Sequence, residues 1–181
     1  MKALIIYDSI FGNTQKIARD LAQTLSETLT THLIPAREAT LDVLKEEKIL
    51  LIGSPTQQYN PTPAVQAFLE RIPDDTLQGV FVAAFDTRYR VSHWSSGSAA
   101  WIIARLLQHT GPSLIVPPQS FFVAKMEGPL EEGETERARQ WATTVLEKVK
   151  GIAMAAEERP TEMAEHRSSQ EQRFPRRSVQ Y

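Results

Sequence analysis

The chain has 181 residues, of which 41% are hydrophobic, and this is about the length and apolar content of one globular domain. Its 20 lysines and arginines against 22 acidic residues give a net charge of -2, so no overall field favours nucleic acid or an anionic membrane as a partner. The absence of cysteine excludes disulfides, thiol redox couples and cysteine-ligated metal centres, and any redox chemistry therefore needs a bound cofactor.

Short β-branched segments alternate along the chain with longer segments of helical period. The expected strands span residues 2–7, 31–35, 48–53, 80–85 and 113–116, and the expected helices span residues 14–29, 62–71, 98–109 and 134–150. Helix starts are indicated at Asn13 or Thr14, at Pro61 or Pro63, and at the sequence GETE. Near-continuous apolar strands such as ILLIG need burial on both sides. The pattern therefore predicts a doubly wound α/β fold, a five-stranded parallel sheet with helices on both faces.

Near the C-terminus the composition changes to mixed charges with few aliphatic side chains. We interpret residues 1–155 as one domain and residues 156–181 as a polar tail that is flexible by its composition. The alternative is that the end of the tail, RFPRRSVQY, docks on a partner or an acidic surface. No apolar run approaches the roughly 18 residues of a membrane span, and no signal-peptide core follows the first residues. We expect a cytoplasmic protein, and no feature of the sequence specifies an oligomeric state.

The sequence SIFGNT, residues 9–14, joins the first strand to the first helix without a spacer. Ligands of open parallel sheets bind at the carboxyl ends of the strands, where a helix start offers free N–H groups and a positive dipole end. The hydroxyls of Ser9 and Thr14, the close approach allowed by Gly12 and the amide of Asn13 suit an anion such as a phosphomonoester. Neither GxxxxGK[ST] nor GxGxxG is present. The alternative interpretation is an ordinary helix-capping cluster.

Two further loops at the same edge carry aromatic residues, residues 53–63 after the third strand and residues 85–98 after the fourth. Tyr59, Tyr89, His93 and Trp94 are placed to flank a flat ring system, because planar surfaces are held well by aromatic stacking. Taken one at a time, each of these side chains is also compatible with ordinary loop packing. The convergence of three such loops favours a ligand site.

These loops resemble those of the flavodoxins and flavodoxin-like FMN proteins, and the resemblance covers residues 1–150. SIFGNT is similar to the family's phosphate loop, GSPTQQYNPTP to its second flavin loop and FDTRY to its third. The resemblance implies the strand order 2-1-3-4-5 and FMN as the cofactor. It also implies a short-chain type, since residues 114–123 are too few for the insertion of long-chain members.

The residues that we expect to bind FMN come from all three loops. They are Ser9, Ile10, Phe11, Gly12, Asn13, Thr14, Pro55, Thr56, Gln57, Gln58, Tyr59, Asp86, Thr87, Arg88 and Tyr89. The resemblance places Asp86, Thr87 and Tyr89 along the isoalloxazine, with Tyr89 stacked on it. No side chain is expected to be catalytic, and no metal site is expected.

Arg88 and Arg90 depart from the family, whose members are generally strongly acidic around the flavin. A cation beside the ring stabilises the negative charge that full reduction adds, so we expect both arginines to raise the potential of the fully reduced couple. The alternative is that they point to water or pair with Asp86 or Glu127, in which case the potential barely changes.

The cofactor supplies the redox chemistry, while the protein sets its binding, potential and access. We favour an FMN electron carrier that serves a redox partner protein or a small electron acceptor. The alternative is an FMN-dependent NAD(P)H:quinone-type oxidoreductase, with His93 or Tyr89 as a proton donor. A receiver-like signalling domain is disfavoured, because the third strand ends in Gly53-Ser54 without a phosphoacceptor aspartate.

Overall fold

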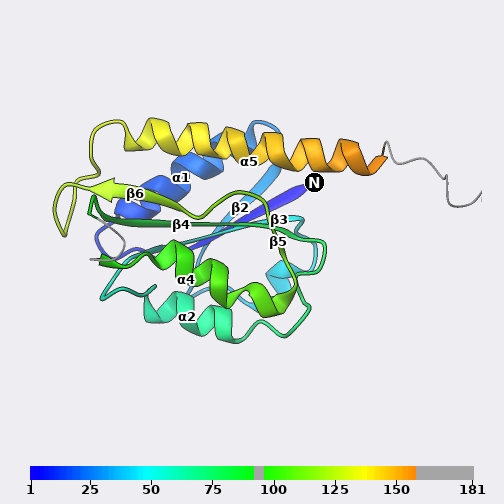
Figure 1. The fold of residues 1–181 in the computed structure, drawn as a ribbon, viewed down its shortest axis with the longest axis horizontal. Coiled ribbons are helices and arrows are strands. Elements are labelled where there is room, and N and C mark those ends of the chain that lie inside the picture. The colour runs from blue at the N-terminus through cyan, green and yellow to red at the C-terminus, as the bar shows by residue number, and fades with distance from the viewer. Residues whose placement is uncertain (92–95, 158–181) are drawn as a thin grey trace, which may run out of the picture. The chain divides into compact units, whose positions relative to one another are not determined.

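The computed structural model describes residues 1–91 and 96–157, and Figure 1 shows its elements. In chain order these are β1 (Lys2–Tyr7), α1 (Asn13–Ser26), β2 (Thr30–Pro35), η1 (Leu41–Leu44), β3 (Ile49–Pro55), α2 (Pro63–Glu70), β4 (Phe81–Tyr89), α4 (Ala99–Leu106), η2 (Gln108–Thr110), β5 (Ser113–Leu114), β6 (Gln119–Val123) and α5 (Glu134–Glu157). The sheet order is β2-β1-β3-β4-β5, with every pair parallel. The predicted doubly wound fold and strand order are confirmed.

The sheet is buried on both faces, as the continuous apolar strands predict. Side chains alternate along each strand, and in β1 Ala3 and Ile5 pack in one core cluster while Leu4 and Ile6 pack in the other. Helices α1 and α5 cover the first face, and α2 and α4 cover the second (Figure 1). The same alternation continues in β3 and β4, so a residue's position along a strand decides which pair of helices it faces.

The fifth strand position differs from the prediction. One strand was expected at residues 113–116, but two short strands lie along β4: β5 pairs with Phe81 and Val82, and β6 pairs with residues 85–89. Pro117 and Pro118 lie between them. Proline has no N–H to donate to a ladder, so the edge is interrupted there and resumes at Gln119. The strand β6 was not predicted.

Strand β4 was expected to end at Phe85 but runs to Tyr89, because it pairs with β3 as far as Thr87 and with β6 as far as Tyr89. Residues 86–89, predicted to lie in a loop, are therefore in a strand. Helix α1 begins at Asn13, with Gly12 as its N-cap residue at φ 85° and no side-chain cap, so neither Asn13 nor Thr14 caps it. The first residue of α2 is Pro63, one of the two predicted starts.

Two compact units divide the chain, residues 1–149 and residues 150–181. The described part of the second unit, residues 150–157, is helical. Of the predicted tail only residues 156 and 157 are described, and residues 158–181 lie outside the described part of the chain. Among the helices described, none has the length and apolar character needed to cross a membrane.

Candidate functional site

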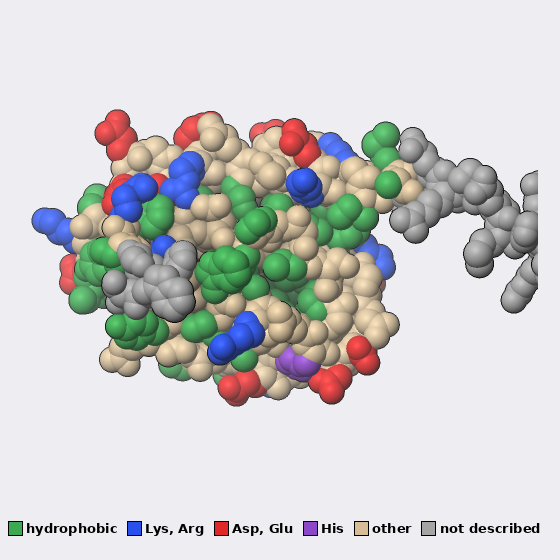
Figure 2. All heavy atoms as spheres, viewed as in Figure 1, with side chains coloured by type: hydrophobic (Ala, Val, Ile, Leu, Met, Phe, Trp, Pro, Cys, Tyr) green, Lys and Arg blue, Asp and Glu red, His purple; other side chains and the backbone are tan. Residues whose placement is uncertain are grey.

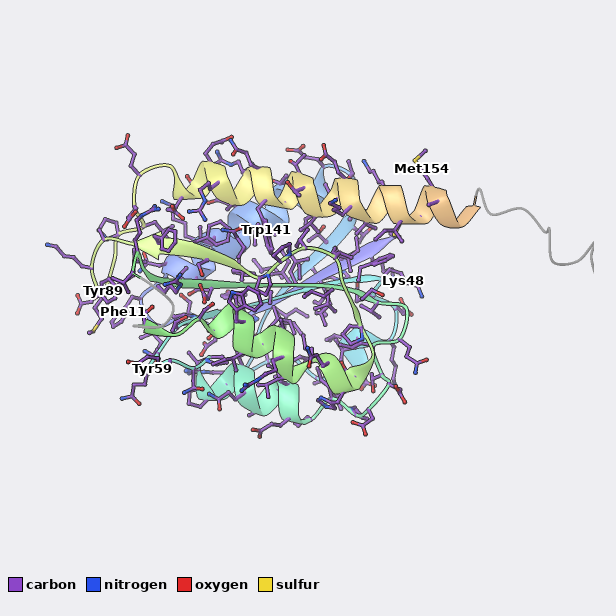
Figure 3. The ribbon with its side chains drawn as sticks, in the orientation of Figure 1. Phe11, Lys48, Tyr59, Tyr89, Trp141 and Met154 are labelled. Carbon is purple, nitrogen blue, oxygen red and sulfur yellow. The ribbon has the colours of Figure 1, made fainter. Side chains whose placement is uncertain are left out.

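A cavity of about 650 Å³ opens at the carboxyl ends of β1, β3 and β4. Of the predicted site residues, all but Gly12 and Asp86 line it. Seven further residues line it as well: Asn60, Pro61, Pro63, Gln66, Ser96, Val123 and Met126. Figure 3 shows Phe11, Tyr59 and Tyr89 together at this end of the sheet, opposite to Lys48. The three loops therefore converge as predicted.

The turn between β1 and α1 holds a buried polar atom without a partner. The Oγ of Ser9 is buried and forms no hydrogen bond with any described residue. The adjoining start of α1 has no side-chain cap, and the first N–H groups of a helix have no acceptor within it. The positive φ of Gly12, 85°, turns the chain into the helix there. The turn thus presents unused donors, and a ligand with acceptor oxygens would satisfy them.

The other polar side chains of this turn already have partners. Thr14 is buried, and its Oγ1 lies 2.7 Å from Oγ1 of Thr87 on β4. One of the two hydroxyls donates to the other, and the acceptor keeps its own hydrogen for another partner. Asn13 donates from Nδ2 to the carbonyl of Glu127 at 3.1 Å. The predicted anion donor Asn13 thus also ties the turn to the segment after β6.

The second loop presents Tyr59 from a tight turn. Gln57 and Asn60 exchange two backbone hydrogen bonds of 2.8 Å, and the intervening Gln58 and Tyr59 have φ values of 46° and 72°. Non-glycine residues rarely adopt this region. The Asn60 side chain donates to the carbonyl of Gln58 at 2.9 Å, which helps to hold the turn.

Gly97 fixes the position of this turn against the third loop. It forms a bridge with Tyr59, its φ is +71°, and a Cβ there would lie 2.5 Å from the Tyr59 Cα. Only glycine fits so close an approach at positive φ. The second and third loops are therefore joined directly beside the cavity.

Aromatic rings stand exposed at the cavity mouth. Tyr59 is 55% exposed, Phe11 47% and Tyr89 40%, although large aromatic side chains usually bury most of their area. Figure 2, in the orientation of Figure 3, shows apolar side chains at this end of the molecule and across the middle of the same face. These rings provide flat surfaces on which a planar ligand could stack.

Asp86 lies beneath the cavity rather than along it. It is fully buried, and its Oδ2 accepts hydrogen bonds from Ser98 Oγ (2.6 Å), Thr56 Oγ1 (3.0 Å) and Ala100 N (3.1 Å). Burial raises the pKa of the Asp86 carboxyl above its ordinary value, while the hydrogen bonds, first among them that from Ser98, lower it. Asp86 therefore connects β4 to the second loop and to the start of α4.

The two arginines of the third loop have different environments. Arg88 is buried and lines the cavity, and its Nε lies 3.9 Å from Asp86 Oδ1, the partner that the alternative interpretation proposed. Arg90 does not line the cavity and pairs with Glu131 and Glu134, not with Glu127. The sequence alone gave the two arginines the same role, but their surroundings separate them.

Five of the seven missed lining residues lie in or next to the second and third predicted loops, whereas Val123 and Met126 come from a segment that was not expected to reach the site. Val123 ends β6 and Met126 follows it, and the only local signal was the strand-like run QSFFV. His93 and Trp94, predicted to flank the ring system, lie outside the described residues. No group of three or more potential metal ligands occurs in residues 1–91 and 96–157. The arrangement suits a ligand with an anionic group and a planar ring.

Comparisons with known proteins agree with this geometry. A family model described as "Flavodoxin" matches residues 5–111. A curated protein named "Flavodoxin" from Clostridium saccharobutylicum is 24% identical over 162 residues, 84% of this chain and 99% of its own length.

Two solved structures share the fold. Oxidised Flavodoxin 1 from Bacillus cereus superimposes with a TM-score of 0.70 at 20% identity, over 81% of this chain and 98% of its own. The rubredoxin oxygen:oxidoreductase from Desulfovibrio gigas superimposes with a TM-score of 0.67 at 23% identity, over 83% of this chain but only 36% of its own. The fold thus occurs both as a separate protein and as part of a larger one.

Proposed function

The chain belongs to the flavodoxin family of FMN-binding electron-transfer proteins, and we propose that it is an electron carrier whose FMN lies in the cavity at the carboxyl ends of β1, β3 and β4. The observation that carries this assignment of the site is the buried Ser9 hydroxyl without a partner, at an uncapped helix start. The cavity volume, about 650 Å³, lies within the roughly 300–1,000 Å³ typical of small-molecule sites.

The phosphate would bind in the turn between β1 and α1. Ser9 Oγ and the free N–H groups of the first helical turn would donate to its oxygens, and the helix dipole favours its charge. Either Thr14 or Thr87 has a hydroxyl hydrogen left over from their mutual bond. This turn contains no lysine or arginine, so neutral donors would bind the phosphate.

The ring would lie between the second and third loops. Tyr59 and Tyr89 offer exposed faces for stacking, and Gly97 holds the Tyr59 turn in place. Backbone groups of the same loops are available for the polar edge of the ring. Bound FMN would supply one- or two-electron transfer, and the protein's part is to bind it, orient it and set its potential.

The site supports transfer to a partner better than catalysis on a bound substrate. The exposed rings at the cavity mouth would leave the cofactor edge near the surface, where another redox protein or a small acceptor could approach. The alternative, an NAD(P)H:quinone-type oxidoreductase, is not favoured by the flavodoxin matches. We also propose a cytoplasmic location, since a chain without cysteine needs no disulfide-forming compartment.

Two measurements test this proposal. Titration of the apo-protein with FMN should quench flavin fluorescence at one equivalent, and FAD should bind more weakly because no second nucleotide fingerprint is present. The reduced FMN-bound protein should then reduce two equivalents of cytochrome c, a one-electron acceptor. Failure to bind FMN would reject the cofactor site, whereas rapid NAD(P)H oxidation with a quinone and no added reductase would reject the carrier in favour of the enzyme.

A further inference from the structure

Two opposite charges lie next to one another on β4 at the base of the cavity. Asp86 and Arg88 are two residues apart and therefore point to the same face of the sheet. Both are buried, with Arg88 Nε 3.9 Å from Asp86 Oδ1. Arg88 reaches the cavity, whereas Asp86 does not. Water screens such a pair much less than it screens a surface pair.

The guanidinium of Arg88 is held by several acceptors. Its Nε donates to Ser120 Oγ at 2.9 Å on β6, and its Nη1 donates to the carbonyls of Tyr89 (3.2 Å) and Val91 (2.6 Å) and to Ser96 Oγ (3.1 Å). These bonds fix the positive charge under the third loop. It cannot turn outward to solvent without leaving several acceptors unpaired.

The carboxylate of Asp86 is divided between two environments. Oδ2 accepts all three hydrogen bonds, from Thr56, Ser98 and Ala100. Oδ1 is buried and, among the described residues, accepts no hydrogen bond. Arg88 is the cation that faces this oxygen, so the two charges partly cancel at the cavity.

Arg90 lies in a different setting. Its side chain is 56% exposed and its charge is matched by two carboxylates, with Nε 2.6 Å from Glu131 Oε2 and Nη2 3.2 Å from Glu134 Oε1. Its guanidinium carbon lies 4.1 Å from the Phe122 ring centre. Solvent and the paired acids therefore remove most of its long-range field.

We propose that Arg88 and Asp86 form a buried charge pair that sets the reduction potential of the FMN site, Arg88 raising it and Asp86 lowering it, while Arg90 has little effect. The inference rests on the proposed FMN site. Reduction by two electrons and one proton adds one negative charge beside this pair. Arg88 stabilises that added charge and Asp86 opposes it. Removal of Arg88 should therefore lower the potential, and removal of Asp86 should raise it.

The test is a potentiometric titration of the FMN-bound protein with dithionite at pH 8, for wild type, Arg88→Gln, Asp86→Asn and Arg90→Gln. A unit charge on Arg88 or Asp86 and the charge of reduced FMN, taken as about 10 Å apart at an effective dielectric constant of about 20, interact strongly enough to change the binding equilibrium of the reduced cofactor about tenfold. We therefore expect the ratio of affinities for reduced and oxidised FMN to fall about tenfold in Arg88→Gln and to rise about tenfold in Asp86→Asn. Each change corresponds to about 30 mV for a two-electron couple. Arg90→Gln is the matched control and should stay close to wild type.

Two variants separate charge from structure. Asn in place of Asp86 can still accept the three hydrogen bonds through its amide oxygen, so the charge is removed with little change in shape. Arg88→Lys keeps the charge but loses most of the hydrogen bonds, and it should stay closer to the wild-type potential than Arg88→Gln does. Thermal unfolding of each apo-variant checks that it is folded.

The outcomes are distinct. Opposite shifts in Arg88→Gln and Asp86→Asn, with Arg90→Gln unchanged, support the charge pair. Shifts in the same direction would show loop distortion and overturn it, as would a larger effect of Arg90→Gln, or no shift in either member of the pair. A wild-type protein that takes up no FMN would instead reject the proposed function itself, and this inference with it.

Discussion

Replacement of Ser9 by alanine should separate phosphate binding from folding. The Ser9 Oγ is buried and accepts or donates no hydrogen bond among the described residues. Its removal therefore breaks no bond in the ligand-free protein, and it relieves the cost of an unsatisfied hydroxyl, which is about 1–3 kcal/mol. We expect Ser9→Ala to unfold at a urea concentration no lower than that of wild type, and higher by as much as this relief allows, on the order of 1 M.

The same substitution should weaken FMN selectively. A hydrogen bond from a hydroxyl to a phosphate is charge-assisted and contributes about 1.5–3 kcal/mol, which is roughly a 10- to 150-fold increase in Kd. Riboflavin has the same ring and side chain but no phosphate, so its Kd should stay unchanged. Flavin fluorescence quenching with both ligands measures the two constants directly.

The matched control is Ser26→Ala, at the exposed C-terminal end of the same helix α1. It should change neither ligand. Equal weakening of FMN and riboflavin in Ser9→Ala would mean that Ser9 shapes the loop rather than contacting the phosphate. An unchanged Kd for FMN would place the phosphate elsewhere and refute the reasoning from the unpartnered hydroxyl.

Three other substitutions give different patterns. Thr14→Ala breaks the hydrogen bond to Thr87 and should lower the free energy of unfolding of the apo-protein in urea by about 1 kcal/mol. It should also weaken the binding of FMN more than that of riboflavin, by about 1–3 kcal/mol. Equal losses of affinity for the two flavins would contradict this prediction. Gly97→Ala puts a Cβ 2.5 Å from the Tyr59 Cα and should weaken the binding of FMN and riboflavin equally in the same fluorescence titration. A loss of affinity for FMN alone would contradict the proposed stacking geometry. Because the pKa of Asp86 is raised by burial, the folded state holds this proton more tightly than the unfolded state. As pH rises from about 4 through the folded-state pKa, the free energy of unfolding of the wild-type apo-protein should therefore fall relative to that of Asp86→Asn, by at most about 1.4 kcal/mol per pH unit. Urea unfolding of both proteins across this pH range measures the difference, and a difference that does not change with pH would contradict the prediction.

The parts of the fold that local sequence specifies could be predicted. The apolar runs of β1 and β3, and the proline at the start of α2, depend on neighbours along the chain, and the structure agrees with them. The two-residue β5 and the separate β6 could not be found in this way. They exist because β4 offers a partner along its whole length while Pro117 and Pro118 interrupt the edge between them.

The residues of the site, like those of the fold, could be predicted where their signal is local and not where it depends on distant segments. The turn at residues 9–14, which borders the cavity, could be proposed as a binding turn because its residue types and its position before a helix are local features. Ser96 lies in the third predicted loop, whereas Met126 lines the cavity only because a segment distant in sequence reaches it, and it has no local signal. The pairing of Arg88 with the nearby Asp86 was one of the alternatives that the sequence left open, whereas the pairing of Arg90 with Glu134 depends on a residue far away in the sequence and was not predicted.

The extension of β4 over residues 86–89 explains how neighbouring residues of one segment contact opposite faces of the sheet. In a loop, residues 86–89 would have no fixed alternation, but pairing with β3 and β6 imposes it. Thr87 then faces α1, where it bonds Thr14, while Asp86 faces the start of α4, where it bonds Ser98. A shift of one residue in the pairing of β4 would exchange these faces and bury Thr87 where the carboxylate now holds the second loop. The register of β4 against β3 and β6 is thus a condition for both the proposed phosphate end of the site and the proposed charge pair.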